Sequence, residues 1–291
     1  MATIDKRPLK AYVRFDGTGR IVPSSLILRR KMPKVGKWVE IPAYECCNDT
    51  TSTAPLPFRM LFSNISEVNA IVGDSANVSD WNTYFDLPAF GTPFTSVSVT
   101  GDEVKLYGGS NIIMKESLFD QADTLGTYLL ELDDQAGSII EVEYDALGWD
   151  NNDGCKNLVY INLPSVTIAA EFAFNYAGYD ATTPLIFNLP LLTTIGNYCF
   201  TSCSSLEVIS LPSATTIGSG AFESCPSLIS ISIPACLNLG PTVGDNNVLN
   251  GITGNIITLT VPSALMTCNS GNPDGDIQDL QASNTVTIIT V

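Results

Sequence analysis

The 291-residue sequence contains no histidine, and this absence excludes several kinds of enzyme chemistry. Without an imidazole there is no Ser–His or Cys–His nucleophile pair, no His-ligated metal and no histidine general base. The sequence also lacks any run of about 18 apolar residues, which would indicate a membrane span. Its first residues carry charges but no apolar core, so we expect no secretory signal.

In the absence of histidine, a pair of carboxylates would be the remaining route to acid–base catalysis. Acidic residues are dense in only one region, at Glu131, Asp133, Asp134, Glu141, Glu143 and Asp145. Their alternation with apolar residues around Val142 is equally typical of the solvated face of a strand. We therefore predict no catalytic residues and expect a protein that is not an enzyme.

The eight cysteines form no C-x-x-C pair, and the four-residue spacing of Cys199 and Cys203 is weak evidence for a metal site. Calcium is an alternative, because oxygen ligands occur on three loops, at residues 150–154, 245–247 and 274–276. None of these loops has the EF-hand spacing, and Asn, Asp and Gly are primarily turn formers. We expect no metal or other cofactor, and loop-bound calcium remains the alternative.

Repetition is the dominant feature of the sequence. The phrase Leu-x-x-Ile-x-Leu-Pro, or a close variant, occurs in four full copies and in one partial copy that lacks its first apolar residue, and these copies end at Pro164, Pro190, Pro212, Pro234 and Pro262. The intervals between these prolines are 26, 22, 22 and 28 residues. A period of about 20 to 30 residues indicates a solenoid, in which each unit is one strand and a return segment.

Each unit can be divided into inward and outward positions. Alternation along the strand places Ile209 and Leu211 inward, and Val208 and Ser210 outward. Proline has no N–H to donate, so it should end each strand. In the return segment we predict buried phenylalanine plugs at Phe174, Phe200 and Phe222. One repeated position should form a column of buried thiols, consisting of Cys155, Cys203 and Cys225.

This pattern of strand-Leu-Pro, Ile-Gly, Ala-Phe and Cys-x-x-Leu resembles the BspA-type leucine-rich repeat over residues 155–265. Weaker strand signals at residues 97–99, 130–132 and 142 extend the resemblance to residues 94–154, as degenerate turns. The resemblance implies a curved solenoid that contacts proteins or cell surfaces, usually on secreted bacterial proteins. Residues 286–289 would be a last strand or a cap.

The outward face of the strands is the one surface that repeats, and it is the candidate binding face. Its first row is Tyr160, Ile186, Val208, Ser230 and Thr258, and its second row is Asn162, Asn188, Ser210, Ser232 and Thr260. These neutral side chains suit contact with a glycan or a flat protein surface, and not with nucleic acid, because they carry no positive charge. The same residue types are also common on the solvent-exposed side of any strand. The alternative that this face has no binding role therefore stays open.

The first 50 residues differ from the rest in charge. They hold ten Lys or Arg against five Asp or Glu, a net charge of +5, whereas residues 51–291 carry −21. Alternation predicts short strands over residues 11–15, 20–22, 25–29 and 37–41, which form only a marginal core. We expect this head to dock on an acidic protein surface through Arg14, Arg20, Arg29, Arg30, Lys31, Lys34, Lys37 and Trp38.

Residues 10–23, together with residues 38–41, resemble N-terminal segments on virion proteins of crAss-like and related tailed phages. This resemblance implies an anchor to the particle and a displayed solenoid. We therefore expect a virion component, assembled in the host cytoplasm, with other virion proteins and its own copies as partners. A host cell-surface protein or glycan would be a further partner, and we expect neither nucleic-acid binding nor membrane insertion. The alternative is a bacterial surface or secreted adhesion protein.

These observations together predict a mainly β protein with three parts. A basic β domain at residues 1–50 is followed by a linker and N-terminal solenoid cap at 51–93, and by the leucine-rich-repeat solenoid at 94–291. The Thr, Ser and Pro residues of 49–57 are typical of a linker. A short helix with Ser79 as its N-cap should place Trp81 and Phe85 against the first coil.

Overall fold

The computed structural model describes residues 10–15, 27–29, 37–41, 55–119, 125–148, 154–240 and 247–291. The chain divides into two compact units, Met1–Ala54 and Pro55–Val291. The described part of the first unit is an antiparallel sheet in the order β2-β1-β3, formed by β1 (Lys10–Phe15), β2 (Ile27–Arg29) and β3 (Lys37–Ile41). The fourth predicted strand, residues 20–22, lies outside the described residues, and the domain boundaries at 50 and 93 stay predictions.

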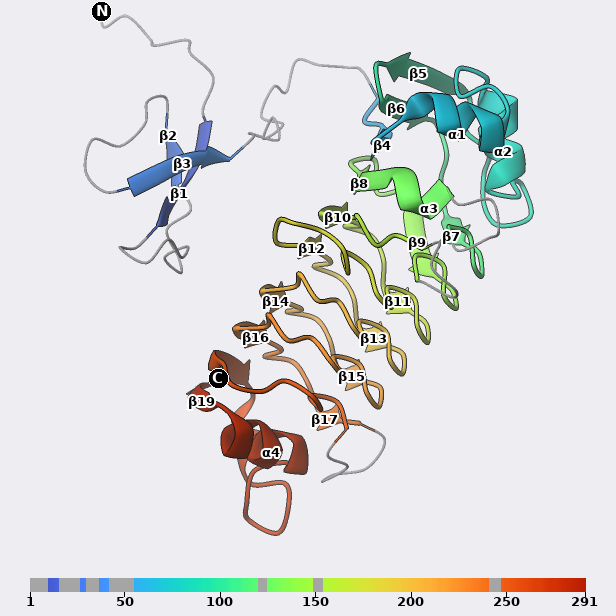
Figure 1. Cartoon of the computed structure of the whole chain (residues 1–291). Helices are drawn as coiled ribbons and strands as arrows, with labels where there is room; N and C mark the ends of the chain where they lie inside the picture. Colours follow the sequence, from blue (N-terminus) through green and yellow to red (C-terminus); the bar gives the residue numbers. More distant parts are fainter. Residues whose placement is uncertain are drawn as a thin grey trace, which may run out of the picture. The chain divides into compact units, whose positions relative to one another are not determined.

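The second unit is built around a parallel β-solenoid, which confirms the predicted architecture (Figure 1). Each coil contributes a strand to a first sheet, namely β8 (Leu129–Asp134), β10 (Tyr160–Asn162), β12 (Ile186–Asn188), β14 (Val208–Ser210), β16 (Ser230–Ser232) and β18 (Ile256–Val261). The return path contributes strands to a second sheet, namely β7 (Ile112–Met114), β9 (Ile139–Val142), β11 (Ile168–Ala169), β13 (Thr194–Ile195), β15 (Thr216–Ile217) and β17 (Asn238–Leu239). The repeat prolines follow the first-sheet strands, as predicted.

The N-terminal end of the solenoid is closed by antiparallel strands. β4 (Phe58–Phe62) pairs with β8 and with β6 (Glu103–Tyr107), and β6 pairs with β5 (Ser96–Thr100). The prediction that residues 97–99 belong to a degenerate coil was therefore wrong. The chain turns back through the two residues Gly101 and Asp102, with Gly101 at a φ of 59°, and so forms a hairpin instead of a crossover.

Three helices accompany these strands: α1 (Ile65–Val72), α2 (Val78–Tyr84) and α3 (Leu125–Tyr128). The capping helix was predicted with Ser79 as its N-cap, but α2 begins earlier and its N-cap is Asn77. The Asn77 side chain accepts a hydrogen bond from the Ser79 N–H at 3.0 Å. Asparagine is at least as good an N-cap as serine, so the earlier of the two residues takes the role.

The aromatic residues of α2 and its C-terminus seal the solenoid, as predicted. Trp81 and Phe85 are fully buried. The Phe85 ring lies edge-on to that of Phe119, with centroids 6.3 Å apart, and Trp81 stacks on Phe62 of β4 at 6.1 Å. The cap therefore covers the apolar end of the first coil with a cluster of aromatic side chains.

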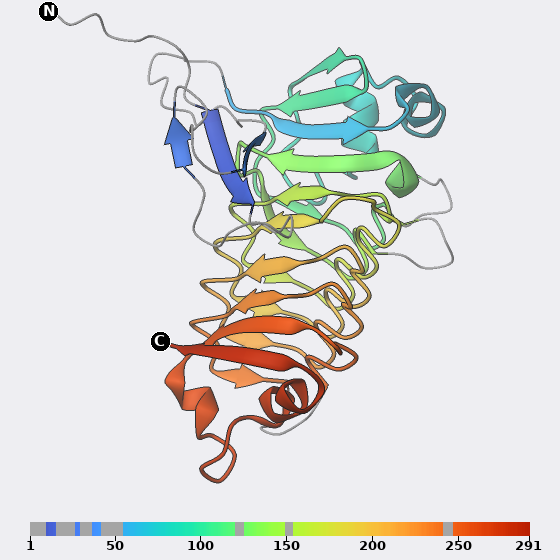
Figure 2. The same cartoon turned by 60° about the vertical axis from the view of Figure 1, so that its left-hand side comes forward.

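The coils stack in register. The first-sheet strands form two hydrogen-bonded groups, β12-β10-β8-β4-β6-β5 and β14-β16-β18-β19, which follow one another along the solenoid (Figure 2). A bridge between Leu185 and Leu206 joins them. Leu185 is buried, so the repeat that the sequence analysis described as lacking its first apolar residue has one, shifted by one position.

Stacked phenylalanine rings fill the interior of three successive coils and confirm the predicted plugs. Phe174 and Phe200 have ring centroids 5.2 Å apart, and Phe200 and Phe222 have centroids 5.3 Å apart, with interplanar angles of 11° and 4°. Phe187 of β12 lies edge-on to both Phe174 and Phe200. All four rings are buried, so the column replaces water contact with ring contact across coil boundaries.

The Ile-Gly motif of the repeat has a steric cause. A Cβ on Gly196 would lie 2.4 Å from backbone atoms of Ala170 and Glu171 in the preceding coil. A Cβ on Gly218 would lie 2.5 Å from the backbone of Gly196 and Asn197. Only glycine permits neighbouring coils to approach this closely at the corner that follows the second-sheet strand.

The predicted thiol column is buried. The thiols of Cys203 and Cys225 donate to the carbonyl oxygens of Phe174 and Phe200 at 3.2 and 3.1 Å. Burial raises the pKa of Cys225 to about 12 and that of Cys203 well above its ordinary value. Cys203, Cys225 and Cys155 form no disulfide, and they serve as small apolar filler, Cys203 and Cys225 with a weak donor. Two further cysteines, at positions 46 and 47, lie outside the described residues.

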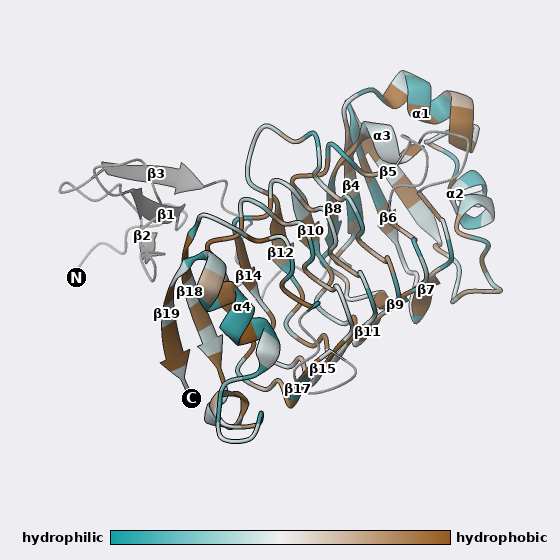
Figure 3. Cartoon of the chain, turned by 60° about the horizontal axis from the view of Figure 1, so that its bottom comes forward, coloured by the Kyte–Doolittle hydropathy of each residue, from teal (hydrophilic) through white to brown (hydrophobic). Residues whose placement is uncertain are grey.

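The C-terminal end is closed differently. After β18 come η1 (Ser263–Met266), α4 (Gly275–Ser283) and β19 (Thr285–Thr290), which pairs parallel with β18 and is largely hydrophobic (Figure 3). The last predicted strand is thus confirmed. Asp274, which sequence analysis placed on a candidate calcium loop, is instead the N-cap of α4 and accepts from the Asp276 N–H at 3.1 Å.

The plug column yields a stability prediction. Phe222→Ala should lower the free energy of unfolding by about 3–5 kcal/mol, because it removes a buried ring that stacks on Phe200. Ser210→Ala, on the exposed side of β14, should change it by less than about 0.5 kcal/mol. Urea unfolding followed by circular dichroism measures both values. Equal losses would mean that the strand is shifted by one residue, so that its inward and outward sides are exchanged.

Candidate functional site

The ten predicted binding-face residues all lie on the outward side of first-sheet strands. The register places Tyr160 opposite Ile186, Asn162 opposite Asn188, and Ser210 opposite Ser232. With the outward residues that β18 and β19 add, they form a surface that we call the strand face: Tyr160, Asn162, Ile186, Asn188, Val208, Ser210, Ser230, Ser232, Ile256, Thr258, Thr260, Thr285, Thr287 and Ile289. Their role in binding stays a prediction.

The strand face carries no Asp, Glu, Lys or Arg. Four of its aliphatic side chains are about half exposed, at 54%, 53%, 63% and 47% for Ile186, Val208, Ile256 and Ile289. No Lys or Arg follows Lys156 in the sequence, so this part of the chain offers no positive charge to a polyanion. Uncharged surface with exposed aliphatic groups is typical of the central part of protein interfaces.

A side-chain ladder fixes one end of the strand face. The Asn188 amide donates to Asn162 Oδ1 at 2.7 Å, and the Asn162 amide donates to Asp133 Oδ1 at 2.7 Å. Asp133 is fully buried, and its other carboxylate oxygen accepts from Gln135 Nε2 at 2.7 Å. The ladder therefore orders the asparagine side chains of two coils while it satisfies a buried charge.

A charged cluster lies next to the ladder, where the cap joins the solenoid. Arg59 of β4 donates to Glu103 and to Glu131, the latter at 2.7 Å, and Lys105 pairs with Glu103 at 2.7 Å. Burial opposes the charge of Arg59, but its bonds to the two glutamates raise its pKa. Burial would also raise the pKa of Glu103, yet the bonds from Lys105 and Arg59 lower it. A carboxylate held ionised by two cations suits a structural tie and not proton transfer.

The carboxylates considered for catalysis are divided between the two sheets. Glu131 and Asp133 are on the outward side of β8, whereas Glu141 is on β9. Asp134 faces the interior, where burial raises its pKa although it accepts from the Ile139 N–H at 2.7 Å. Glu143 accepts from the backbone of the preceding coil. Within the described ranges, no three His, Cys, Asp or Glu side chains gather as a metal ion would require.

The other candidate calcium loops fall mostly on residues that the structure does not describe, namely 149–153 and 241–246. In the parts of the chain that are described, no helix has the length and apolar character needed to cross a bilayer.

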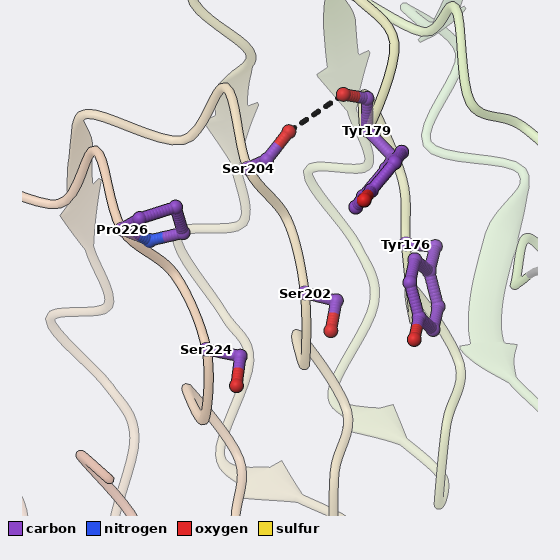
Figure 4. A pocket seen from close by; sticks show the side chains of 6 residues that line it. All are labelled: Tyr176, Tyr179, Ser202, Ser204, Ser224 and Pro226. Carbon is purple, nitrogen blue, oxygen red and sulfur yellow. Dashed lines mark hydrogen bonds between the residues drawn. The ribbon is translucent and has the colours of Figure 1, made fainter. Parts of the chain in front are cut away.

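A groove that the sequence analysis missed crosses three coils on the side of the return segments (Figure 4). It has a volume of about 460 Å³ and is lined by Tyr176, Tyr179, Ser202, Ser204, Ser224 and Pro226. Tyr176, Ser202 and Ser224 occupy the same position in successive coils, with left-handed φ values of 56°, 59° and 57°. Residue type differs at this position while backbone conformation does not, so the sequence pattern did not reveal it.

One sequence signal could have indicated the groove. The interval from Pro164 to Pro190 is four residues longer than the two 22-residue intervals that follow it. Ala177 and Leu185 correspond to Cys203 and Leu206 in the next coil, and the segment between them is five residues longer. Leu185 lies one position nearer to its proline than Leu206 does, which leaves the net difference of four. Tyr179 belongs to this insertion.

The predicted anchor residues belong to the first unit. Arg14 of β1 lies opposite Trp38 of β3, Lys37 lies opposite Phe15, and Arg29 lies opposite Lys10. The other four, Arg20, Arg30, Lys31 and Lys34, lie outside the described residues. The structure thus places half of the set on one small sheet, and its anchoring role stays a prediction.

Comparison with known proteins agrees with this geometry. A family model described as the BspA type leucine rich repeat region, in six copies, matches residues 146–246. No curated protein and no solved structure matches the chain. The match covers the coils from β10 to β17 and confirms the resemblance noted in their sequence. Solenoids of this type suggest a protein-interaction or adhesion module, and they are typically non-catalytic.

The ladder yields a second prediction. Asn162→Ala should lower the free energy of unfolding by about 1–3 kcal/mol, because it removes a donor from the buried carboxylate of Asp133. Asn188→Ala should cost less than about 1 kcal/mol, because water can replace its exposed amide. Chemical denaturation of the two variants provides the comparison. If the exposed asparagine proved the more costly to lose, Asp133 would not depend on the ladder.

Proposed function

Because the repeats of residues 146–246 are BspA-type leucine-rich repeats, we propose that this protein is a non-enzymatic binding module that contacts a partner protein through its strand face. The observation that carries the proposal is the continuity of that face, which runs from β10 to β19 without a charged side chain. Aliphatic side chains offer area to bury, and hydroxyl and amide groups beside them can replace lost water contacts.

Rigidity also supports this role. The strand face is fixed by in-register pairing and, at one end, by the ladder from Asn188 to Asp133. A surface ordered before contact loses little conformational entropy on binding, so more of the burial energy appears as affinity. Its β-branched residues have few rotamers to lose.

We also propose that the module is displayed on a phage particle in several copies and that residues 1–50 hold it there. Two observations support this setting: the change from a net charge of +5 in residues 1–50 to −21 in the remainder, and the resemblance of residues 10–23 to segments of virion proteins. The repeat family itself favours the alternative, a bacterial surface or secreted adhesion protein. Locating the intact polypeptide in purified particles or in a cell-envelope fraction distinguishes the two.

A charge placed on the strand face tests the contact. Fluorescently labelled protein should bind host cells, and Ile186→Arg should weaken this binding at least about tenfold, because the contact would have to desolvate a charge. Leu191→Arg is the matched control, since Leu191 is 51% exposed against 54% for Ile186 but lies outside the strand face. Flow cytometry over a concentration series gives the affinities. Equal binding by both variants, or no binding by the unmodified protein, would refute this use of the face.

Removal of the head tests the anchor. Deleting residues 1–50 should leave a soluble β protein that melts cooperatively, because Pro55–Val291 is a compact unit, but that no longer incorporates into particles. Docking by the intact chain should weaken as salt is raised, because the head is basic. Incorporation is measured by quantifying the protein in purified particles. A truncated chain that still assembles normally would make the solenoid, and not the head, the anchor.

A further inference from the structure

We infer that the groove over Tyr176 and Tyr179 is a second binding site, separate from the strand face, and that it takes a neutral oligosaccharide. The groove lies on the return segments of three coils, whereas the strand face lies on the first-sheet strands. The two surfaces therefore use different parts of the same coils.

The inserted loop supplies an aromatic platform. Tyr179 is 43% exposed, and its ring centroid lies 5.2 Å from that of Tyr176, with the rings tilted by 56°. The loop is held in place, because the Tyr179 N–H donates to the Tyr176 carbonyl at 3.0 Å and the Ser204 hydroxyl donates to the Tyr179 carbonyl at 2.6 Å. In repeat proteins, insertions in single repeats gather on one face, which is often the binding face. The exposed ring of Tyr179, held beside the half-buried ring of Tyr176, offers a face on which the C–H face of a sugar can stack.

A serine hydroxyl beside the rings offers a polar contact to a ligand. Ser202 lines the groove and is only 9% exposed, yet its hydroxyl has no hydrogen-bond partner among the described residues. Its backbone is fixed, since its N–H donates to the Glu223 carbonyl at 2.9 Å. A hydroxyl held at the wall of the groove can exchange its contact with water for a hydrogen bond to a ligand hydroxyl.

The serine side chains are also repeated. Ser224 follows Ser202 in the next coil, and within the described residues its hydroxyl likewise has no hydrogen-bond partner. Adjacent coils are separated by about 4.8 Å, so the two hydroxyls recur at roughly the length of one sugar ring. A ligand made of linked, hydroxylated rings matches this arrangement, and Figure 4 shows the serines following the tyrosines from coil to coil.

Charge disfavours an anionic ligand, and the uncharged lining suits a neutral one. All six lining residues are uncharged, and the nearby Asp180 is paired with Lys156 at 3.4 Å. No Lys or Arg follows Lys156, while the chain as a whole carries −16. An acidic polysaccharide, a phosphate or a nucleic acid would meet repulsion with no compensating cation.

The test uses the full chain and four neutral tetrasaccharides: chitotetraose, cellotetraose, maltotetraose and mannotetraose. Saturation-transfer NMR identifies binding, and isothermal titration calorimetry measures affinity. We expect saturable binding of at least one tetrasaccharide, weakened at least about tenfold by Tyr179→Ala. Ser202→Ala should also weaken it. Tyr144→Ala is the matched control, because Tyr144 has the same 43% exposure and an aromatic neighbour in Phe172, but lies outside the groove.

Equal melting temperatures for the variants would show that the fold is intact. Three results would overturn the inference: no binding of any of the four sugars at millimolar concentration, equal weakening by Tyr179→Ala and Tyr144→Ala, or binding that Tyr179→Ala leaves unchanged. A proline-rich decapeptide serves as a further probe, because tyrosine-lined grooves also accept polyproline helices. Tyr179-dependent binding of this peptide, without binding of a sugar, would assign the groove to a peptide instead.

Discussion

The stacking of each coil on the next is the constraint on which the rest of this structure depends. A coil has an apolar side but cannot cover it alone. Three kinds of contact cross the boundaries between coils. They are the hydrogen bonds between strands, the stacking of the Phe174, Phe200 and Phe222 rings, and the hydrogen bond from the Cys225 thiol to the Phe200 carbonyl. Both ends therefore need a different structure: antiparallel strands and aromatic residues at one, and α4 with β19 at the other.

The same constraint explains what could be predicted from the sequence. Stacking in register forces a period and an alternation, so the inward position of Ile209 and the buried ring of Phe222 could be read directly. The antiparallel pairing of β5, which contains residues 97–99, with β6 could not be read in this way. Alternation reports which side of a strand faces the core and not the direction of its neighbour. Leu185 was missed for a related reason, since the insertion before it displaced it by one position.

Candidate surfaces were predictable to different degrees. The strand face followed from alternation alone. The charged cluster did not, because Arg59 is 44 residues from Glu103 and 72 from Glu131, and contacts across an antiparallel cap leave no local pattern. The groove depends on a shared backbone position occupied by Tyr176, Ser202 and Ser224, whose side chains differ in chemistry. Because the residue type varies at this position and none of the three is glycine, the sequence pattern did not reveal their shared backbone conformation.

The two proposed binding surfaces would gain their affinity from short-range contacts. Beyond Lys156 the chain has no positive charge, so it receives little long-range attraction to an anionic cell envelope or nucleic acid. On this proposal, selectivity would come from aliphatic burial on the strand face and from ring stacking and hydroxyl pairing in the groove. Such contacts act only when the partner surface fits closely, which requires side chains that are already ordered. Stacked coils supply that order, because the backbone at Ile186 and at Ser202 is held by hydrogen bonds to neighbouring coils.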